Sequence, residues 1–218
     1  MKKMIFLLIA TVLFSFSYSQ NTKGIVGYEL TPTITSIRGN TVIYNFNSRL
    51  SFSTGLTFEY FIDQQFSLKS GLLFERKGSK IKMDEVDQNG APLGAQETKI
   101  NFDYSILPVL CSYSTKGKTK LYINAGPYVG FLLSQKNNFS SVGTIPEHTE
   151  DNSENTKHLD LGLSLGLGLN FKLNEKLLLD LGLRENRGLI NVNKLHVTNG
   201  GSITTNSFGL QLGLKYIL

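Results

Sequence analysis

The sequence predicts an all-β fold, an eight-stranded antiparallel up-and-down β-barrel, and three observations support this prediction. Apolar residues alternate with small or polar residues along eight segments, which is the period of a sheet with two unlike faces. Short and long connections between these segments alternate strictly along the chain. The composition, with 14 Phe, 9 Tyr and 21 Gly but only 5 Pro, also favours strands over helices.

The clearest strand is predicted at residues 158–173. Every second residue from Leu159 onward is Leu or Phe, whereas the residues between them are Asp, Gly, Ser, Asn or Lys. A helix would scatter both sets around its circumference, so this segment is predicted to be a strand. The same pattern predicts seven further strands, at residues 24–33, 49–62, 66–83, 99–114, 120–135, 177–191 and 203–218. Pro108 lies within one of them and predicts a bulge or local kink there.

The connections predict how the strands are arranged. Three are tight turns, at residues 63–65, 115–119 and 174–176, and four are long, at residues 34–48, 84–98, 136–157 and 192–202. In an up-and-down meander this order sends all tight turns to one end of the barrel and all long loops to the other. Outer-membrane barrels have this asymmetry, with short periplasmic turns and long external loops.

Alternation alone does not say which face meets water, and a soluble barrel of lipocalin type would point its apolar residues inward. The non-apolar face is unusually small, with Gly162, Ser164, Gly166 and Gly168 in succession, as a narrow eight-stranded lumen requires. Charged residues of both signs share that face and are predicted to pair across the lumen: Glu59, Lys69, Glu75, Asp160, Asp180, Arg184 and Lys215. These features favour a transmembrane barrel with its apolar face outside.

Aromatic residues support the same orientation. Tyr60, Phe66, Phe171 and Tyr216 lie in the apolar phase close to the predicted tight turns or the C-terminus, where a barrel places its interfacial girdle. A second ring is predicted near the long loops, from Phe74, Phe131 and Phe208. A closed barrel also leaves no unpaired strand edge in the hydrocarbon, which makes the exposed leucines tolerable.

The N-terminal segment predicts export. Lys2 and Lys3 precede an apolar run that ends at small residues, so residues 1–19 are predicted to be a cleaved signal peptide and residues 20–218 the barrel domain. Loss of the two lysines lowers the net charge of +5 to +3, too little to indicate a nucleic-acid partner. Cys111 is the only cysteine, so no intramolecular disulfide is expected.

The order of five segments carries a family resemblance: residues 50–80, residues 102–113 with Pro108, and residues 121–133, 160–169 and 179–192. In this order and spacing the chain resembles the PorT-like family of outer-membrane β-barrel domain proteins. The resemblance implies an eight-stranded barrel in the outer membrane of a Gram-negative cell. It also implies an association with protein secretion, since the founding member is associated with secretion of proteases. The final residues, Tyr216 to Leu218, depart from the aromatic end that is usual in such barrels.

The sequence offers no reactive constellation, so no catalytic, cofactor-binding or metal-ligating residue is predicted, and no cofactor. His158 and Ser164 share a phase but lie about 20 Å apart along a strand. His148 lies in a long polar loop, and His196 lies close to a predicted strand end. An acidic stretch from Glu147 to Glu154 lacks the ordered ligand spacing of a calcium loop.

The predicted function is therefore a non-enzymatic outer-membrane protein, structural or accessory to protein export. A small channel and a lipid-modifying outer-membrane enzyme are the alternatives. Expected partners are outer-membrane lipid and other envelope or secretion proteins, not nucleic acid; the oligomeric state is left open.

Overall fold

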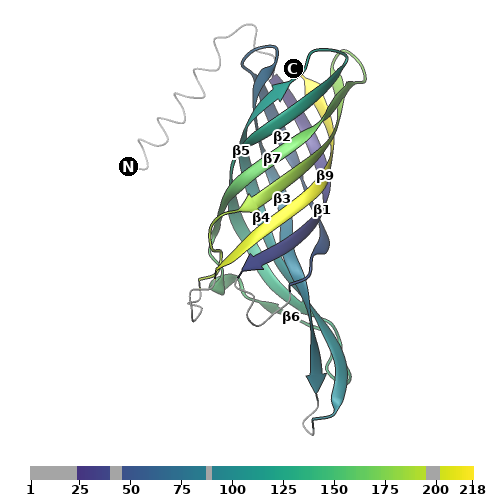
Figure 1. Cartoon of the computed structure of the whole chain (residues 1–218), viewed down its shortest axis with the longest axis vertical. Helices are drawn as coiled ribbons and strands as arrows, with labels where there is room; N and C mark the ends of the chain where they lie inside the picture. Colours follow the sequence, from purple (N-terminus) through teal and green to yellow (C-terminus); the bar gives the residue numbers. More distant parts are fainter. Residues whose placement is uncertain (1–23, 40–45, 87–89, 195–201) are drawn as a thin grey trace, which may run out of the picture.

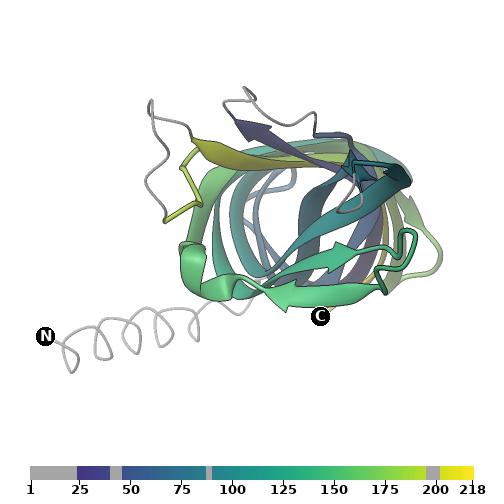
Figure 2. The same cartoon turned by 90° about the horizontal axis from the view of Figure 1, so that it is seen from below.

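The computed structural model describes residues 24–39, 46–86, 90–194 and 202–218. These residues form a closed antiparallel barrel in which each strand pairs with the next and β9 pairs with β1. Figures 1 and 2 show the barrel from the side and along its axis. Its strands are β1 (Gly24–Gly39), β2 (Arg49–Phe61), β3 (Phe66–Val86), β4 (Pro92–Ser114), β5 (Thr119–Phe139), β7 (Leu159–Lys172), β8 (Leu177–Gly188) and β9 (Ile203–Ile217). A short strand, β6 (His148–Asp151), and the 3-10 helix η2 (Ser153–Asn155) lie between β5 and β7.

The structure confirms the eight barrel strands, and the tight turns all lie at the end drawn uppermost in Figure 1. The prediction of four long loops is partly wrong. Residues 84–98 were expected to be a loop, but β3 and β4 continue as a paired hairpin to Val86 opposite Pro92. Residues 136–157 likewise contain the end of β5 and the added strand β6. The alternation of apolar and polar residues fades beyond the membrane zone, whereas backbone pairing continues without it.

The prolines inside the barrel strands show how the ladders accommodate a missing donor. A bulge or local kink was predicted at Pro108. The bulge is wrong, because the register does not shift there; instead, the β3–β4 ladder omits Leu107 and Pro108. Pro32 likewise pairs with β2 but interrupts the ladder between β1 and β9. Pro127 pairs with β7 but interrupts the ladder between β4 and β5. Proline lacks an N–H group and can leave one ladder locally open. The register shift between β4 and β5 occurs at Asp103 and Tyr104.

Two of the tight turns are built alike. Between β2 and β3, Asp63 Oδ1 accepts hydrogen bonds from the backbone N–H groups of Gln65 (2.6 Å) and Phe66 (2.7 Å). Between β7 and β8, Asn174 Oδ1 accepts the equivalent hydrogen bonds from the backbone N–H groups of Lys176 (2.9 Å) and Leu177 (2.8 Å). In the third turn Gly117 has a φ of 130°, which suits glycine. Local side-chain acceptors thus fix the strand register at this end.

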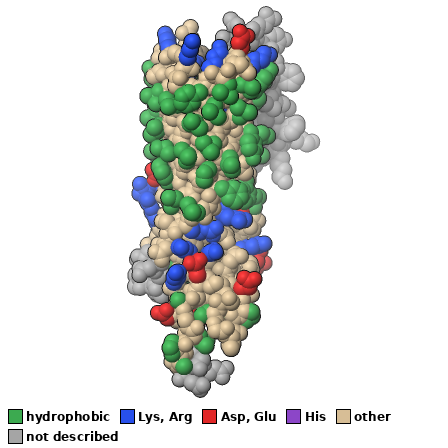
Figure 3. Space-filling model, turned by 90° about the vertical axis from the view of Figure 1, so that its right-hand side faces the viewer, with side chains coloured by type: hydrophobic (Ala, Val, Ile, Leu, Met, Phe, Trp, Pro, Cys, Tyr) green, Lys and Arg blue, Asp and Glu red, His purple; other side chains and the backbone are tan. Residues whose placement is uncertain are grey.

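The outward face is an apolar band that ends at a charged belt (Figure 3). Outward side chains on β3 are apolar from Phe66 to Phe74 apart from Ser70, and the next outward residue is Arg76. On β8 the outward leucines end at Glu185 and Arg187. An apolar surface of this extent needs an apolar solvent, which excludes the soluble-barrel alternative. Within the described residues, no helix is long and apolar enough to cross a membrane.

Beyond the belt, the loop end carries a sheet of its own. The outer parts of β3, β4 and β5 stay paired, and β6 adds to β5, with Phe139 opposite His148. The β3–β4 hairpin projects farthest (Figure 1, lower end). Arg76 binds Asp103 through two hydrogen bonds of 2.6 and 2.8 Å where this sheet leaves the barrel.

Candidate functional site

The lumen is the most polar part of the interior, and its side chains come from all sides of the barrel. Five acidic and four basic side chains among the described residues are buried inside it: Glu29, Glu59, Glu75, Asp160, Asp180, Lys69, Lys77, Arg184 and Lys215. Seven of these were predicted from strand phase, and their pairing in the lumen is confirmed for every one except Glu75. Because the two signs nearly balance, most of these charges compensate one another within the lumen.

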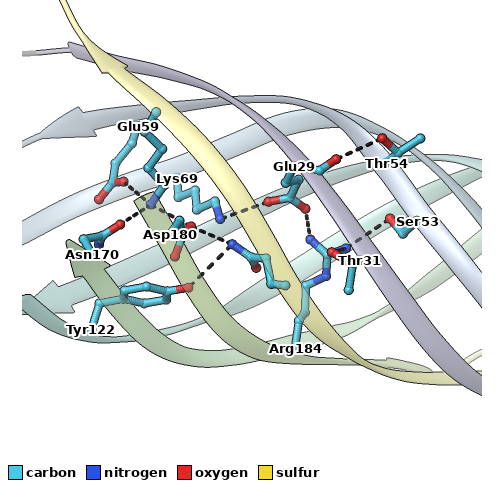
Figure 4. A network of polar contacts seen from close by, with 12 residues as sticks. Glu29, Thr31, Ser53, Thr54, Glu59, Lys69, Tyr122, Asn170, Asp180 and Arg184 are labelled. Atoms are coloured by element: carbon cyan, nitrogen blue, oxygen red, sulfur yellow. Dashed lines mark hydrogen bonds and ion pairs between the residues drawn. The ribbon is translucent and has the colours of Figure 1, made fainter. Parts of the chain in front are cut away.

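Glu29 on β1 is the centre of the middle layer (Figure 4). Its carboxylate accepts a hydrogen bond from the Arg184 guanidinium on β8 and forms an ion pair of 3.3 Å with Lys69 Nζ on β3. Arg184 also donates to Ser53 Oγ at 3.0 Å. These three charged side chains come from three different strands, so together they span the lumen.

A second layer lies toward the tight turns. Lys215 Nζ lies 3.0 Å from Asp180 Oδ2 and 3.4 Å from Glu59 Oε2, and it donates to Asn170 at 3.1 Å. Gln211 donates to Asp180 at 2.7 Å. The ammonium group thus joins two carboxylates on β8 and β2, and this layer separates the middle of the lumen from the tight-turn end.

A third layer lies toward the loops. Lys77 Nζ donates to Asp160 Oδ2 at 3.0 Å and to Tyr128 Oη at 2.9 Å, and the side chains of the ion pair are fully buried. Between this layer and the middle one, Glu75 accepts hydrogen bonds from Asn186 and Ser207. The amide and hydroxyl groups partly compensate the charge of this carboxylate.

An apolar cluster closes the lumen at the loop end. It comprises Ile37, Leu73, Phe102, Tyr104, Ile106, Tyr128 and Val192, with Phe46, Ile100, Leu132 and Ile203 packed against it. A cavity of about 180 Å³ lies between this cluster and residues of the η2 segment. The lumen is therefore filled by charged layers and then by apolar side chains.

The small residues on β7 make room for large side chains of β5. The cross-strand pairs are Gly162 with Tyr128, Gly166 with Asn124, and Gly168 with Tyr122. A Cβ atom at any of these three glycines would lie 2.5–2.6 Å from the side chain of its β5 partner. The predicted narrow lumen thus has a specific cause, because the β5 side chains occupy the volume above the β7 backbone.

At the tight-turn end the lumen opens into a cavity of about 820 Å³, called here the turn-end cup. Its lining includes Lys116, Lys118, Lys120 and Lys172, together with apolar side chains of Ile25, Phe61, Leu178 and Ile217. Glu59 and Asn170 also line it, and both belong to the Lys215 layer. The cup therefore ends at that ion-paired layer.

The histidines and the acidic stretch form no reactive site among the described residues. His148 stacks on Phe139 with ring centroids 4.5 Å apart, and His158 is exposed just before β7 while Ser164 is buried in the lumen. His196 lies outside the described residues. Within the described part of the chain, no three His, Cys, Asp or Glu side chains come together as a metal site.

Two lumen charges, Glu29 and Lys77, were missed by the sequence analysis. Both lie in the inward phase, Glu29 between outward Tyr28 and Leu30, and Lys77 two residues after Glu75. Both could have been found by extending the alternation of inward and outward residues. This alternation continues through the less regular first strand and, in the third strand, past Arg76. Neither the cup nor its lysines were predicted, because turn residues belong to no alternating pattern.

A family model described as the outer membrane protein beta-barrel domain matches residues 10–194. The chain belongs to this family. The apolar band of the barrel is accordingly in contact with lipid of the outer membrane. No curated protein matches the chain.

Among solved structures, this family member is similar to Neisserial surface protein A, with 13% identity, a TM-score of 0.47 and coverage of 91% of this chain and 100% of the other. It is also similar to OprG from Pseudomonas aeruginosa, with 16% identity, a TM-score of 0.45 and coverage of 90% and 95%. Ail, the attachment invasion locus protein of Yersinia pestis, has 12% identity and a TM-score of 0.38, with coverage of 88% and 99%.

Proposed function

We propose that this outer-membrane barrel is a non-enzymatic protein that acts through its two ends, as a structural barrel or as an accessory to protein export, and does not conduct ions. One observation carries the proposal: the contacts of Glu29 with Arg184 and Lys69 span the lumen between three strands. An eight-stranded barrel has an interior that side chains just fill, and here those side chains are paired.

The two ends supply surfaces that a partner protein could contact. At the loop end the paired sheet of β3–β6 extends beyond the apolar band, and its outermost hairpin presents Val86 with 59% of its surface exposed. At the tight-turn end the cup opens beside three turns. An accessory role in export uses such surfaces on both sides of the membrane. Membership of the PorT-like family remains a prediction that would be consistent with this role.

Conductance tests the closed lumen directly. The refolded protein in planar lipid bilayers is expected to give no currents above the lipid background. An open porin of known conductance, inserted into the same bilayers, is the positive control for a detectable opening. Robust single-channel currents from the wild-type protein would support the channel alternative and overturn the proposal.

Site-specific crosslinking tests the role of the ends. A photoreactive amino acid at Gln64, in a tight turn, or at Val86, at the loop end, is expected to yield adducts with envelope proteins in intact cells. The same group at Leu167, which points outward within the apolar band, is the matched control and should crosslink to lipid alone. Absence of protein adducts from both ends would refute an accessory role. Lipid or peptide hydrolysis by the purified barrel, lost in His158→Ala, would instead support the enzyme alternative.

A further inference from the structure

The mouth of the turn-end cup departs from the polar-inward rule of the rest of the barrel. Four inward positions near the tight turns are apolar: Phe61 on β2, Ile25 on β1, Ile217 on β9 and Leu178 on β8. These four strands are consecutive around the ring. One half of the mouth is therefore an apolar wall, in which Ile25 is buried and the other three side chains are partly exposed.

The other half of the mouth is lined by lysines. Lys172 and Lys120 occupy inward positions on the next two strands, β7 and β5, and Lys116 and Lys118 follow on the β4–β5 turn. Lys120 Nζ lies 5.8 Å from the centroid of the Phe61 ring, so the two halves face each other across the opening. None of the four lysines forms an ion pair with any residue that the structure describes.

The carboxylates around the cup are too few to neutralise these lysines. Glu59 is bound to Lys215 and accepts a hydrogen bond from Ser67. Asp63 accepts the two backbone hydrogen bonds of its turn. Glu175 is the remaining acidic residue of the lining, against four lysines. The cup thus combines an excess of positive charge with an apolar wall.

We propose that the turn-end cup binds a short peptide segment rich in acidic and apolar side chains, supplied by a periplasmic protein. Carboxylates of such a segment would meet Lys120 and Lys172, and its apolar side chains would cover Leu178 and Ile217, which are both partly exposed. A volume of about 820 Å³ is within the range of ligand-binding pockets, roughly 300–1,000 Å³. This inference rests on the proposed function, since it names the partner chemistry for one of the two ends.

The depth of the apolar wall favours a peptide over a lipid anion. Directly behind Phe61 and Ile217, the next inward residues on β2 and β9 are Glu59 and Lys215, which are charged and paired. A long acyl chain would therefore run into a charged layer after one residue of apolar wall. A peptide can instead place alternate side chains on the wall and on the lysines.

Fluorescence anisotropy with the refolded barrel in zwitterionic nanodiscs tests the proposal. The probe is a fluorescein-labelled hexapeptide of alternating Asp and Leu. Saturable binding is expected, and Lys120→Gln/Lys172→Gln should weaken it about tenfold, since two exposed ion pairs near the upper end of their range are lost. Lys82→Gln/Lys99→Gln, which removes the same charge from the loop-end sheet, is the matched control and should bind normally. Heat-modifiable migration verifies that each variant is folded.

Two further peptides separate charge from apolar contact. A Lys–Leu hexapeptide should not bind, and an Asp–Ser hexapeptide should bind more weakly than the Asp–Leu peptide. The inference is overturned if the double lysine variant binds as the wild type does, or if Asp–Ser binds equally well. It is also overturned if dodecanoate displaces the peptide at equal concentration, which would indicate a lipid anion. Absence of peptide binding by a non-conducting barrel refutes only this inference, whereas wild-type conductance refutes the proposed function.

Discussion

Lys77 on β3 and Asp160 on β7 form an ion pair inside the barrel, with Nζ 3.0 Å from Oδ2 and neither side chain exposed to solvent. The same ammonium lies 4.3 Å from the centroid of the Tyr128 ring. The pair lies between the polar layers and the apolar cluster of the loop end, so its charges are compensated by each other and by hydroxyl groups.

Removal of one partner should destabilise the barrel. Asp160→Asn leaves the buried Lys77 ammonium without its ion-pair partner, and the expected loss is about 3–5 kcal/mol in the free energy of unfolding. Urea unfolding in lipid vesicles measures it. The double variant Lys77→Met/Asp160→Leu should recover much of the loss, because neither charge of the pair remains. A double variant that is less stable than the single one would contradict the assigned pairing.

Gly166→Ala should destabilise the barrel because the added methyl group would clash with the Asn124 side chain, and a smaller residue at position 124 should relieve this clash. Its Cβ would lie 2.6 Å from Asn124 Oδ1, and all three of the nearest atoms belong to that side chain. Overpacking of this kind costs roughly 1–3 kcal/mol. In an Asn124→Ser background the cost should largely vanish in the same urea titration. An equal cost in both backgrounds would show that the backbone, and not Asn124, limits the size at this position.

The β2–β3 turn should respond to acid, whereas the β7–β8 turn should not. The N–H groups of Phe66 and Gln65 hold the pKa of the Asp63 carboxyl below its ordinary value. Because the folded pKa is the lower one, this stabilisation is complete above the unfolded pKa of about 3.9 and is lost as pH falls through the folded value. Asn174 makes the equivalent bonds without a titrating group.

Asp63→Asn should therefore preserve the turn and remove its acid sensitivity. Amide hydrogen exchange at Phe66 between pH 2 and 5, corrected for intrinsic exchange rates, measures the effect, with Leu177 as the internal reference. Identical pH dependence of protection at the two amides in the wild type would contradict the role of the Asp63 carboxylate.

A charge in the apolar band should cost more than the same charge at the hairpin tip. Leu167 is 52% exposed and pairs with Ile123 and Leu183 on its two neighbouring strands, which also point outward. Leu167→Arg should cost about 2–4 kcal/mol in vesicles, the range for arginine near the midplane. Val86→Arg, at a residue that is 59% exposed beyond the belt, should cost almost nothing. Equal costs for the two variants would show that the membrane boundary assigned here is wrong.

The sequence predicted the barrel well because lipid imposes a strict period on the outward side chains. It placed Glu59, Asp160 and Arg184 inside because, once one face of a strand is assigned to the lipid, every second residue of that strand must point into the lumen. It did not predict the outer β3–β4 hairpin, since a strand with solvent on both faces needs no alternation of apolar and polar residues. The turn-end cup escaped prediction for a related reason: Lys116 and Lys118 lie in a turn, where sequence alone does not give side-chain direction. Cleavage of residues 1–19 remains a prediction, since these residues lie outside the described ones.

The seam between β1 and β9 has a kinetic consequence. Ile25 pairs with Ile217, and Leu218 donates its N–H to the carbonyl of Gly24 at 2.9 Å, so the ring closes between strands at opposite ends of the chain. Contacts of such high sequence separation form slowly. The edges of β1 and β9 therefore stay open until the final strand arrives. Until then the unfinished sheet can pair with any other edge that it meets, including that of a second copy, and the last strand ends this exposure.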